Sequence, residues 1–388
     1  MPDKMKILVV GPYPPPYSGP ETSIKLLMES PLKDWANIRL LNTNFRKDMA
    51  SKGRMDFRAV CALLRIFFLL AWECIRFRPN IVYYYVTATR NGWLFKDIWV
   101  ILISRLFFRK TVIHMRAGHF KYEFKKMNRF SRFLIRFACR KCSLAFVQAN
   151  CLRDQFEGII PKEKIHYVYN MIDVNKYQNN CPHSYDKGRF FYMGHLSTAK
   201  GYCDLLSVIP RIVQEYPWCK FIFAGYKLET ERNVFQEQTS GRSIDSESPE
   251  EAYAKYIQGK CEENYQYIGP IAEEQKLIEL QKCMAFVLPS YSEGFSMAVL
   301  EALSFAKPIV CTPVGALGEV VKDCVNGLIV EAGDREALYQ ALKRIICDSS
   351  LRETMIDCNR KYTAQTFSQE IVSRKIYEEF LHLLKPCH

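Results

Sequence analysis

After Asp186, short apolar runs alternate with helical stretches. Strands joined in this way by helices form a parallel sheet with helices on both faces, because each connection must return to the end of the sheet where the strand began. The sequence therefore predicts an α/β fold with a doubly wound sheet. Strands are expected at residues 190–193, 220–224, 267–268, 286–288, 309–311 and 328–330, and helices at 205–215, 273–282, 297–305 and 317–321.

The first half of the chain shows the same alternation less clearly. Strands are expected at 6–10, 81–86 and 111–115, with helical stretches between them. The first strand is followed by a loop that ends at Gly19 and by a helix expected over 21–28. A helix that begins after such a loop presents free N–H groups to an anion, so the opening suits a phosphate. It lacks the GxGxxG pattern of dinucleotide sites.

The domain organisation follows from length and local composition. A chain of 388 residues suggests two or three domains. The boundary is expected within 179–186, where Asn, Cys, Pro, His and Ser cluster between periodic segments. This places domains at 1–180 and 186–365, with a C-terminal helix over 366–388 that packs back towards the first domain. A polar stretch over 227–263, which includes 239–243, is expected to hold a helix and an insertion.

Charge is distributed unevenly between the two halves. Residues 1–180 contain 31 Lys and Arg against 13 Asp and Glu, and residues 101–142 contain 12 Lys and Arg against Glu123 alone. Within 124–141, cations and aromatic residues recur at helical spacing, which suits a helix lying on an anionic leaflet. The alternatives are a core-facing helix with solvated cations, or a nucleic-acid partner. No recognition motif accompanies the charge, so we expect no nucleic acid.

The compartment is expected to be the cytoplasm. The fifteen cysteines are scattered and odd in number, and the start of the sequence lacks a secretory signal. The pair Cys139 and Cys142 has no second pair that would complete a zinc site. The most apolar stretch, 59–75, is interrupted by Arg65 and Glu73, so we expect a buried helix rather than a membrane span.

The most informative motif runs from Pro289 to Val310. A strand is expected to end at Pro289, and a helix to begin near Ser296 with free N–H groups facing the loop between them. Glu293 lies in this loop and Glu301 one to two turns into the helix, so both carboxylates can face one ligand. A carboxylate that accepts from vicinal hydroxyls is a natural ribose or sugar clamp. Two glutamates at this spacing, taken alone, are usually solvated.

This motif resembles the Glu-x7-Glu motif of family 4 glycosyltransferases, which are retaining enzymes of the GT-B fold. The resemblance continues through 312–319 and 326–330. It implies two Rossmann-like domains that face each other across a cleft holding the active site. It also implies that Glu301 holds the nucleotide ribose and that Glu293 contacts the transferred sugar. The backbone at Gly294, Phe295 and Ser296 would bind sugar hydroxyls and diphosphate, and Gly269 and Ile271 are also expected to bind the donor.

A second loop, 194–201, carries a single cation. Lys200 can neutralise a diphosphate oxygen as charge builds on the leaving group; the alternative is a solvated surface lysine. The family usually has an arginine after the first glycine, Gly194, whereas this chain has His195. This histidine either weakens the second phosphate contact or makes it dependent on pH. No Asp-x-Asp pair occurs, so we expect a metal-independent reaction with no cofactor besides the nucleotide-sugar donor.

The first half contributes a third group of candidates. Relatives place a catalytic-centre histidine where this chain has Arg116, which can act only as a charged donor. It either sits in the active site or turns outward to join the basic face. His114 is expected to be structural, because side chains alternate along a strand. His119 is a weaker catalytic candidate. Gly19 matches the first glycine of the family's Gly-Gly loop against the donor phosphate, and Pro20 replaces the second.

These observations lead to one functional expectation and two alternatives. The resemblance implies transfer of a hexose-type sugar from a UDP- or GDP-sugar, bound by the second domain, to an oligosaccharide or lipid-linked acceptor, bound by the first. Such a transferase would act in surface polysaccharide synthesis at the inner face of the cell membrane, as a peripheral protein. The alternatives are an epimerase-like protein of the same fold, and a non-catalytic sugar-nucleotide-binding subunit that activates a partner transferase.

Overall fold

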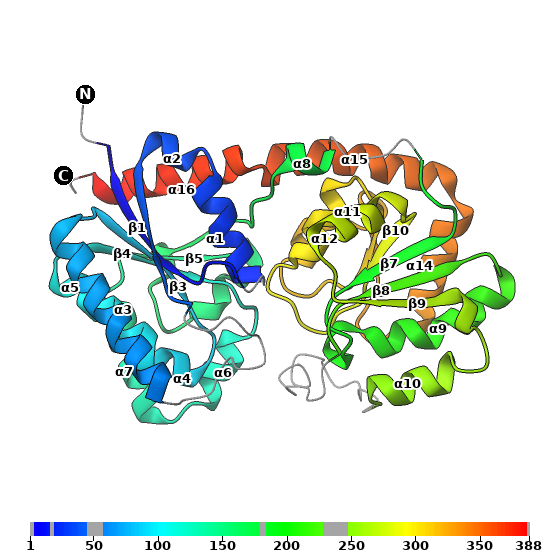
Figure 1. The fold of residues 1–388 in the computed structure, drawn as a ribbon, viewed down its shortest axis with the longest axis horizontal. Coiled ribbons are helices and arrows are strands. Elements are labelled where there is room, and N and C mark those ends of the chain that lie inside the picture. The colour runs from blue at the N-terminus through cyan, green and yellow to red at the C-terminus, as the bar shows by residue number, and fades with distance from the viewer. Residues whose placement is uncertain (1–3, 16–18, 45–56, 179–183, 228–246, 386–388) are drawn as a thin grey trace. The chain divides into compact units, whose positions relative to one another are not determined.

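The computed structural model describes residues 4–15, 19–44, 57–178, 184–227 and 247–385. The chain divides into two compact units (Figure 1). The first unit contains Met1–Met171 and Phe367–His388, and the second contains Ile172–Thr366. The boundary expected within 179–186 lies largely outside the described residues, and so does the segment 239–243.

The first unit is a parallel sheet covered by helices on both faces. Its six strands lie in the order β2-β1-β3-β4-β5-β6, and every pairing is parallel. The strands at 6–10, 81–86 and 111–115 are confirmed, whereas β2, β5 and β6 were not predicted. The bounds are β1 Lys6–Gly11, β2 Asn37–Asn42, β3 Ile81–Val86, β4 Lys110–Met115, β5 Leu144–Val147 and β6 Ile165–Tyr167.

Figure 1 shows α1, α2 and α16 on one face of this sheet and α3, α5 and α7 on the other. On the first face, Ile24, Tyr83 and Phe380 belong to one buried cluster, so the C-terminal helix completes the core of the unit. The helices are α1 Gly19–Glu29, α2 Leu32–Trp35, α3 Phe57–Arg76, α4 Arg90–Gly92, η2 Trp93–Asp97, α5 Ile98–Leu106, α6 Phe120–Lys126, α7 Arg129–Arg140, η3 Asn150–Phe156, η4 Lys162–Lys164 and α16 Gln369–Leu384.

Helix α3 corrects the expectation of a buried helix over 59–75. Its inner face is buried through Ala59, Leu70 and Cys74, but Leu64 and Phe68 are 62% and 68% exposed. The helix is apolar on both sides. Only one side packs on the unit, so the apolar residues of the other side are exposed. No described helix is long and apolar enough to cross a membrane.

The basic segment 124–141 forms parts of two helices rather than one. Asn128 separates α6 from α7, with its side chain accepting a hydrogen bond from the Ser131 N–H at 2.8 Å. An asparagine in this position satisfies a free N–H group of the first turn, so α7 begins anew after it. On α7, Ile135 and Ala138 are buried while Phe130, Phe133 and Phe137 are exposed.

The second unit confirms the predicted doubly wound sheet. Its six parallel strands lie in the order β12-β11-β10-β7-β8-β9, with parallel pairing throughout. The chain begins at β7, builds outward to β9, then returns to the other side of β7 with β10 and builds outward to β12. The strands are β7 Arg189–Met193, β8 Lys220–Ala224, β9 Tyr265–Gly269, β10 Ala285–Leu288, β11 Ile309–Cys311 and β12 Gly327–Ile329.

Helices alternate with these strands, and the four helices expected from the sequence are confirmed. The polar stretch over 227–263 contains α10, which begins with a capping box at Ser248 and Glu251. The helices are α8 Val174–Gln178, η5 Thr198–Lys200, α9 Tyr202–Glu215, α10 Pro249–Tyr256, η7 Glu262–Asn264, α11 Glu273–Lys282, α12 Met297–Ser304, α13 Leu317–Val320, α14 Arg335–Cys347 and α15 Ser349–Phe367. Both units thus have the Rossmann-like α/β architecture that was predicted.

Candidate active site

The order of strands in the second unit identifies where a ligand is expected. Strands β7 and β10 are neighbours, and the chain leaves them in opposite directions across the sheet. In doubly wound folds this reversal opens a crevice at the carboxyl ends of the two strands, where ligands bind. The loop that follows β7 carries Lys200, and the loop that follows β10 carries Glu293. The topology therefore brings together the two loops that the sequence singled out.

These two loops pack directly on each other. The Tyr291 N–H donates to the Ala199 carbonyl oxygen at 3.0 Å. Gly201 has a φ of +68°, and a Cβ atom there would lie 2.0 Å from the Pro289 carbonyl oxygen. Only glycine combines this backbone conformation with so close an approach. Gly201 thus fixes the position of Lys200 relative to the loop of Glu293.

Lys200 and Glu293 form an ion pair. The Lys200 Nζ donates to Glu293 Oε1 at 2.7 Å, and the Ser290 hydroxyl donates to the same oxygen at 2.8 Å. The Glu293 side chain is buried, whereas that of Lys200 is partly exposed. No described residue hydrogen-bonds to Glu293 Oε2, so this oxygen keeps its capacity to accept from a ligand hydroxyl. The lysine retains further donors for an anion.

The loop of Glu293 is also held from the next strand along. Gly315 follows β11 and has a φ of +56°; a Cβ atom there would lie 2.2 Å from the Glu293 carbonyl oxygen. The Ala316 N–H donates to the Gly294 carbonyl oxygen at 2.8 Å. Phe295 is buried beside this loop. The backbone of Gly294 and Phe295 is therefore fixed in place before any ligand binds.

Helix α12 begins at the end of this loop and carries Glu301. Ser296 is its N-cap, with the hydroxyl accepting from the Val299 N–H at 3.5 Å. Glu301 is buried in the second turn. Its Oε1 accepts from Lys276 Nζ at 2.7 Å and from the Tyr177 hydroxyl at 3.2 Å. No described residue hydrogen-bonds to Oε2, which leaves one acceptor oxygen for a ligand.

Lys276 and Tyr177 link Glu301 to a second carboxylate, Glu273. Lys276 Nζ lies 2.8 Å from Glu273 Oε2, and Lys176 Nζ lies 2.6 Å from Oε1 of the same group. Burial alone would lower the pKa of Lys276, but the Glu301 and Glu273 carboxylates outweigh it and raise that pKa. Lys276 therefore stays charged and compensates Glu301.

The same network determines the protonation states of Tyr177 and Glu273. Burial and then the Glu301 carboxylate raise the pKa of Tyr177, so its hydroxyl remains a neutral donor. Burial would raise the pKa of Glu273, but Lys276 and Lys176 hold it at about 2. Glu273 is therefore ionised at neutral pH. The sequence had not indicated Lys276 or Tyr177, because each reaches Glu301 from a different helix.

His195 lies in the loop after β7, beside the Lys200 pair. Its ring is partly buried against Tyr226, with centroids 6.3 Å apart, and its Nδ1 is buried without a hydrogen-bond partner among the described residues. Burial and then the Lys200 charge lower the pKa of His195. Its titration in the ligand-free protein therefore lies below its usual range, and at neutral pH His195 is a neutral hydrogen-bonding group.

The remaining predicted donor residues of the second unit surround the same strand ends. Gly194 directly follows β7, and a Cβ atom there would make only ordinary contacts. Gly269 ends β9 with a φ of +74°, and Ile271 lies in the short connection to α11. The Gly225 N–H donates to the Gly269 carbonyl oxygen at 2.9 Å, which ties the ends of β8 and β9 together.

In the first unit, Arg116 directly follows β4. Its guanidinium stacks on the Tyr85 ring at 5.5 Å, and its Nε is buried without a partner in the described chain. Burial lowers the pKa of Arg116, opposed by Tyr85 and Tyr83. The side chain thus packs on the end of β3, and within the described part of the chain it forms no ion pair.

The other candidates of the first unit differ in their surroundings. His114 is fully buried on β4, where its Nδ1 lies 2.6 Å from the Tyr83 hydroxyl, and burial lowers its pKa well below the usual value. His119 is the N-terminal neighbour of α6 and is partly buried. Gly19 opens α1, and a Cβ atom there would meet open space. Packing against the described residues therefore does not require glycine at position 19.

Known proteins provide an independent comparison. Residues 173–362, nearly the whole of the second unit, match the family model described as glycosyl transferases group 1. The second unit is therefore similar to the domains that this family model describes. The strand-end loops with Lys200 and Glu293, and Glu301 on α12, are part of the matched region.

Two curated relatives and one solved structure illustrate the similarity. The chain is 35% identical to an uncharacterized glycosyltransferase of Methanocaldococcus jannaschii over 26% of this chain and 29% of that protein. It is 26% identical to the capsular polysaccharide biosynthesis glycosyltransferase CapM of Staphylococcus aureus over 50% of this chain and 46% of CapM. The matches thus span less than half the length of either relative.

The solved structure supports the fold over the full chain. HepE of Anabaena, determined in complex with UDP-glucose, superposes with a TM-score of 0.69 at 18% identity, covering 97% of this chain and all of that chain. At this identity the likeness establishes the fold alone. Together with the strand orders of the two sheets, it shows that the chain has the GT-B type of α/β fold.

Proposed function

We propose that this protein is a retaining glycosyltransferase that moves a sugar from a UDP- or GDP-sugar to an oligosaccharide or lipid-linked acceptor. The observation that carries the proposal is the pairing of Lys200 with Glu293 at the switch point of a unit that matches the glycosyl transferases group 1 model. HepE, which shares the fold, was determined with UDP-glucose. We further propose that the second unit binds the donor and the first unit binds the acceptor.

In the proposed complex, Glu301 and Lys200 hold opposite ends of the nucleotide diphosphate. Glu301 Oε2 accepts from the ribose hydroxyls, since Oε1 is already occupied by Lys276 and Tyr177. Lys200 donates to the diphosphate, where negative charge grows as the bond to the sugar breaks. The N-terminus of α12 adds N–H groups and a positive dipole end on the same side. These groups stabilise the leaving group without a metal ion, so we propose a metal-independent reaction.

Glu293 is proposed to contact the transferred sugar. Its Oε1 is bound by Lys200 and Ser290, which fixes the carboxylate and leaves Oε2 to accept from a sugar hydroxyl. The backbone of Gly294, Phe295 and Ser296 follows at once and is fixed by Gly315. When the diphosphate binds, Lys200 can interact with it while keeping one donor on Glu293, because an ammonium group has three N–H donors.

The acceptor and the biological setting rest on the relatives and on the first unit. CapM is a capsular polysaccharide biosynthesis enzyme, and we propose that this chain likewise acts in surface polysaccharide synthesis. Arg116 is proposed to hold a donor phosphate or an acidic group of the acceptor. Its buried Nε has no partner among the described residues, and a guanidinium can satisfy that donor on an oxyanion. His119 and Gly19 are proposed to contribute to the same site.

We also propose that the protein works in the cytoplasm, attached peripherally to the inner face of the cell membrane. Helix α5 packs against both α3 and α7, and the outer faces of these three helices expose Phe68, Trp99 and Phe133. Exposed cations, including Arg129 and Arg140 on α7, accompany these aromatic residues. Aromatic side chains at the acyl boundary and cations at the headgroups are the pattern of an interfacial surface. We define this outer face of α3, α5 and α7 as the interfacial face.

A second candidate is a non-catalytic sugar-nucleotide-binding subunit. The observation that favours it is the loss of three family residues, at Pro20, Arg116 and His195. His195 is neutral at neutral pH because burial lowers its pKa, so it cannot replace a phosphate-binding arginine in charge. Binding of the donor is common to both candidates, and only turnover separates them.

The test has two stages. Thermal unfolding of the full chain is first followed with a panel of UDP- and GDP-sugars, because a ligand that binds the native state raises the midpoint. The ligand that does so is then incubated with the protein alone, with and without EDTA, and release of the nucleoside diphosphate is measured. Release that survives EDTA supports a metal-independent transferase. Binding without hydrolysis or transfer supports the subunit, and no binding of any panel member contradicts both.

A further inference from the structure

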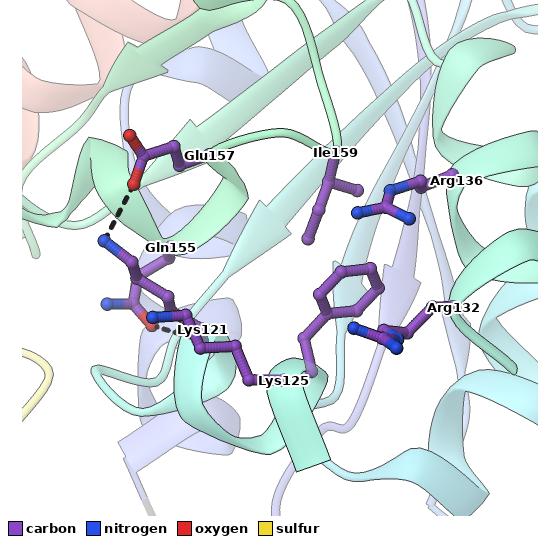
Figure 2. A pocket seen from close by; sticks show the side chains of 8 residues that line it. Lys121, Lys125, Arg132, Arg136, Gln155, Glu157 and Ile159 are labelled. Atoms are coloured by element: carbon purple, nitrogen blue, oxygen red, sulfur yellow. Dashed lines mark hydrogen bonds and ion pairs between the residues drawn. The ribbon is translucent and has the colours of Figure 1, made fainter. Parts of the chain in front are cut away.

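A separate pocket lies in the first unit, between α6, α7 and the residues after η3. Its volume is about 330 Å³, within the range of sites for small ligands. Figure 2 shows Lys121 and Lys125 on one side of this space and the guanidinium groups of Arg132 and Arg136 on the other. The lining residues are Lys121, Phe124, Lys125, Arg132, Arg136, Gln155, Glu157 and Ile159. We call this space the α6–α7 pocket.

Two of the four cations in the lining already have partners. Lys121 Nζ lies 2.8 Å from a Glu157 carboxylate oxygen and 3.2 Å from Asp154. Arg136 donates from Nε to the Gly158 carbonyl oxygen at 3.1 Å, and its guanidinium stacks on the Phe124 ring at 5.3 Å. The charge of Lys121 is thus compensated by carboxylates. Arg136 is held in position by uncharged groups, so its charge is not compensated by these contacts.

The other two cations, Lys125 and Arg132, form no ion pair with a described residue, although the charge of Lys125 contributes, after that of Lys121, to the lowered pKa of Glu157. The Nε of Arg132 is also buried without any hydrogen-bond acceptor from the described chain. No described residue accepts a hydrogen bond from any nitrogen of the Arg132 guanidinium, so its terminal donors are available to a ligand in the pocket that Arg132 lines. The pocket therefore has an excess of positive charge and a specific donor without an acceptor.

The chemistry of the lining favours a phosphate group. Guanidinium groups bind tetrahedral oxyanions through parallel hydrogen bonds, and Arg132 and Arg136 come from successive turns of the same helix face. The apolar side chains of Phe124 and Ile159, both buried, line the same space. They limit hydration, and an ionic contact is stronger where water is excluded. They also offer a surface for the first carbon atoms attached to the phosphate.

We propose that the α6–α7 pocket binds the phosphate group of a phosphorylated ligand. This site belongs to the first unit and is built from residues other than those assigned to the donor. The inference does not depend on the proposed transferase activity, because it rests only on the pocket, its excess of cations over carboxylates and the guanidinium of Arg132, which no described residue hydrogen-bonds. The phosphate can belong to a soluble phosphate ester or to a lipid headgroup, and the two sources are separated by experiment.

The experiment compares a pocket variant with a matched control in the full chain. The pocket variant is Lys125→Gln with Arg132→Gln; the control is Lys33→Gln with Arg374→Gln, which removes the same charge from exposed positions of α2 and α16, outside the pocket and away from the interfacial face. One arm measures binding of glycerol 3-phosphate by calorimetry. The other measures sedimentation with phosphatidylcholine vesicles that contain phosphatidic acid. The second unit is unchanged in both variants, so any phosphate bound there contributes equally.

The expected result is that the pocket variant binds at least about tenfold more weakly than the control in one or both arms, the loss typical of removing charged hydrogen bonds. A loss with glycerol 3-phosphate assigns the site to soluble phosphate esters, and a loss with vesicles alone assigns it to a lipid headgroup. Equal binding of the two variants in both arms overturns the proposal. If the double variant unfolds, Lys125→Gln alone gives the same comparison, because this exposed side chain makes no ion pair within the described residues.

Discussion

Lys200 Nζ lies 2.7 Å from Glu293 Oε1, although the two residues are 93 positions apart in the sequence. The pairing depends on the neighbouring positions of β7 and β10 and on Gly201, whose missing side chain lets the two loops touch. In the ligand-free protein the cation and the carboxylate compensate each other. In the proposed complex the diphosphate attracts the same lysine, so we expect donor binding and the position of Glu293 to be coupled.

Replacing Lys200 by alanine is expected to reduce turnover more than donor binding. Charge on the leaving diphosphate is larger in the transition state than in the bound donor, so the lost cation affects kcat most. Steady-state kinetics with the donor identified by thermal unfolding measure both constants, and Lys255→Ala on the surface is the control. A raised KM with normal kcat contradicts a role in leaving-group stabilisation.

Replacing Lys276 by methionine is expected to destabilise the protein by about 3 kcal/mol, since Glu301 is then buried without its cation. Urea denaturation measures the change. Lys255→Met breaks a pair whose lysine is exposed, and it should cost less than about 1 kcal/mol. In the Lys276→Met background, Glu301→Gln should recover part of the loss, because it removes the unpaired charge. Additive losses in the double variant would show that the pair is not coupled.

Arg116 tests how the first unit departs from the family pattern. We expect Arg116→Ala to lose most transfer activity and Arg116→His to restore part of it. The activity of Arg116→Lys should lie between that of Arg116→Ala and that of the wild type, because the lysine ammonium is a point charge and lacks the planar fork of hydrogen-bond donors of a guanidinium. Arg153→Ala is the matched control, since Arg153 also stacks on a tyrosine, Tyr167, in the same unit. Activity of Arg116→Ala within about twofold of the wild type, roughly 0.4 kcal/mol, would place Arg116 outside the active site.

The interfacial face is tested by replacing aromatic residues rather than cations. Phe130→Ser with Phe133→Ser should reduce binding to anionic vesicles several-fold. Each Å² of apolar surface that enters the membrane contributes about 25 cal/mol to binding, and the two serines remove most of the apolar surface of these side chains. Transfer to a soluble acceptor should be unchanged. Ile371→Ser, at an exposed position of α16, is the control. Vesicle sedimentation at low salt measures the binding. If the wild type binds neutral and anionic vesicles equally, the interfacial face does not select an anionic membrane, contrary to the proposal.

Most strands and helices of the second unit were predictable because each strand is a compact apolar run with loop residues on both sides. Two of the three strands missed in the first unit are less distinct. β2 lies at the edge of the sheet and only Leu41 of it is buried, so this strand does not need a long apolar run. β6 has only three residues, too few to show a pattern. The exposure of α3 was mispredicted for another reason. An apolar helix is buried only if a further layer covers it, and periodicity does not reveal that layer.

The loops of the candidate site were predictable, but their support was not. Gly294 and the start of a helix at Ser296 predict a ligand-binding loop from local sequence. Tyr177 and Lys276 reach Glu301 from α8 and α11, across 124 and 25 positions of sequence. Neither residue stands in a recognisable motif, so only the tertiary structure shows that Glu301 has a compensating cation.

The most direct test of the account is calorimetric titration of the nucleoside diphosphate of the preferred donor into the wild type, Glu301→Gln and Glu336→Gln. Glu336 is an exposed carboxylate paired with Arg211 and serves as the control. If the donor lies at the carboxyl ends of β7 and β10 with its ribose on Glu301, Glu301→Gln should weaken binding by about 1–3 kcal/mol, and Glu336→Gln should not change it. Unchanged affinity in Glu301→Gln would contradict the placement of the nucleotide.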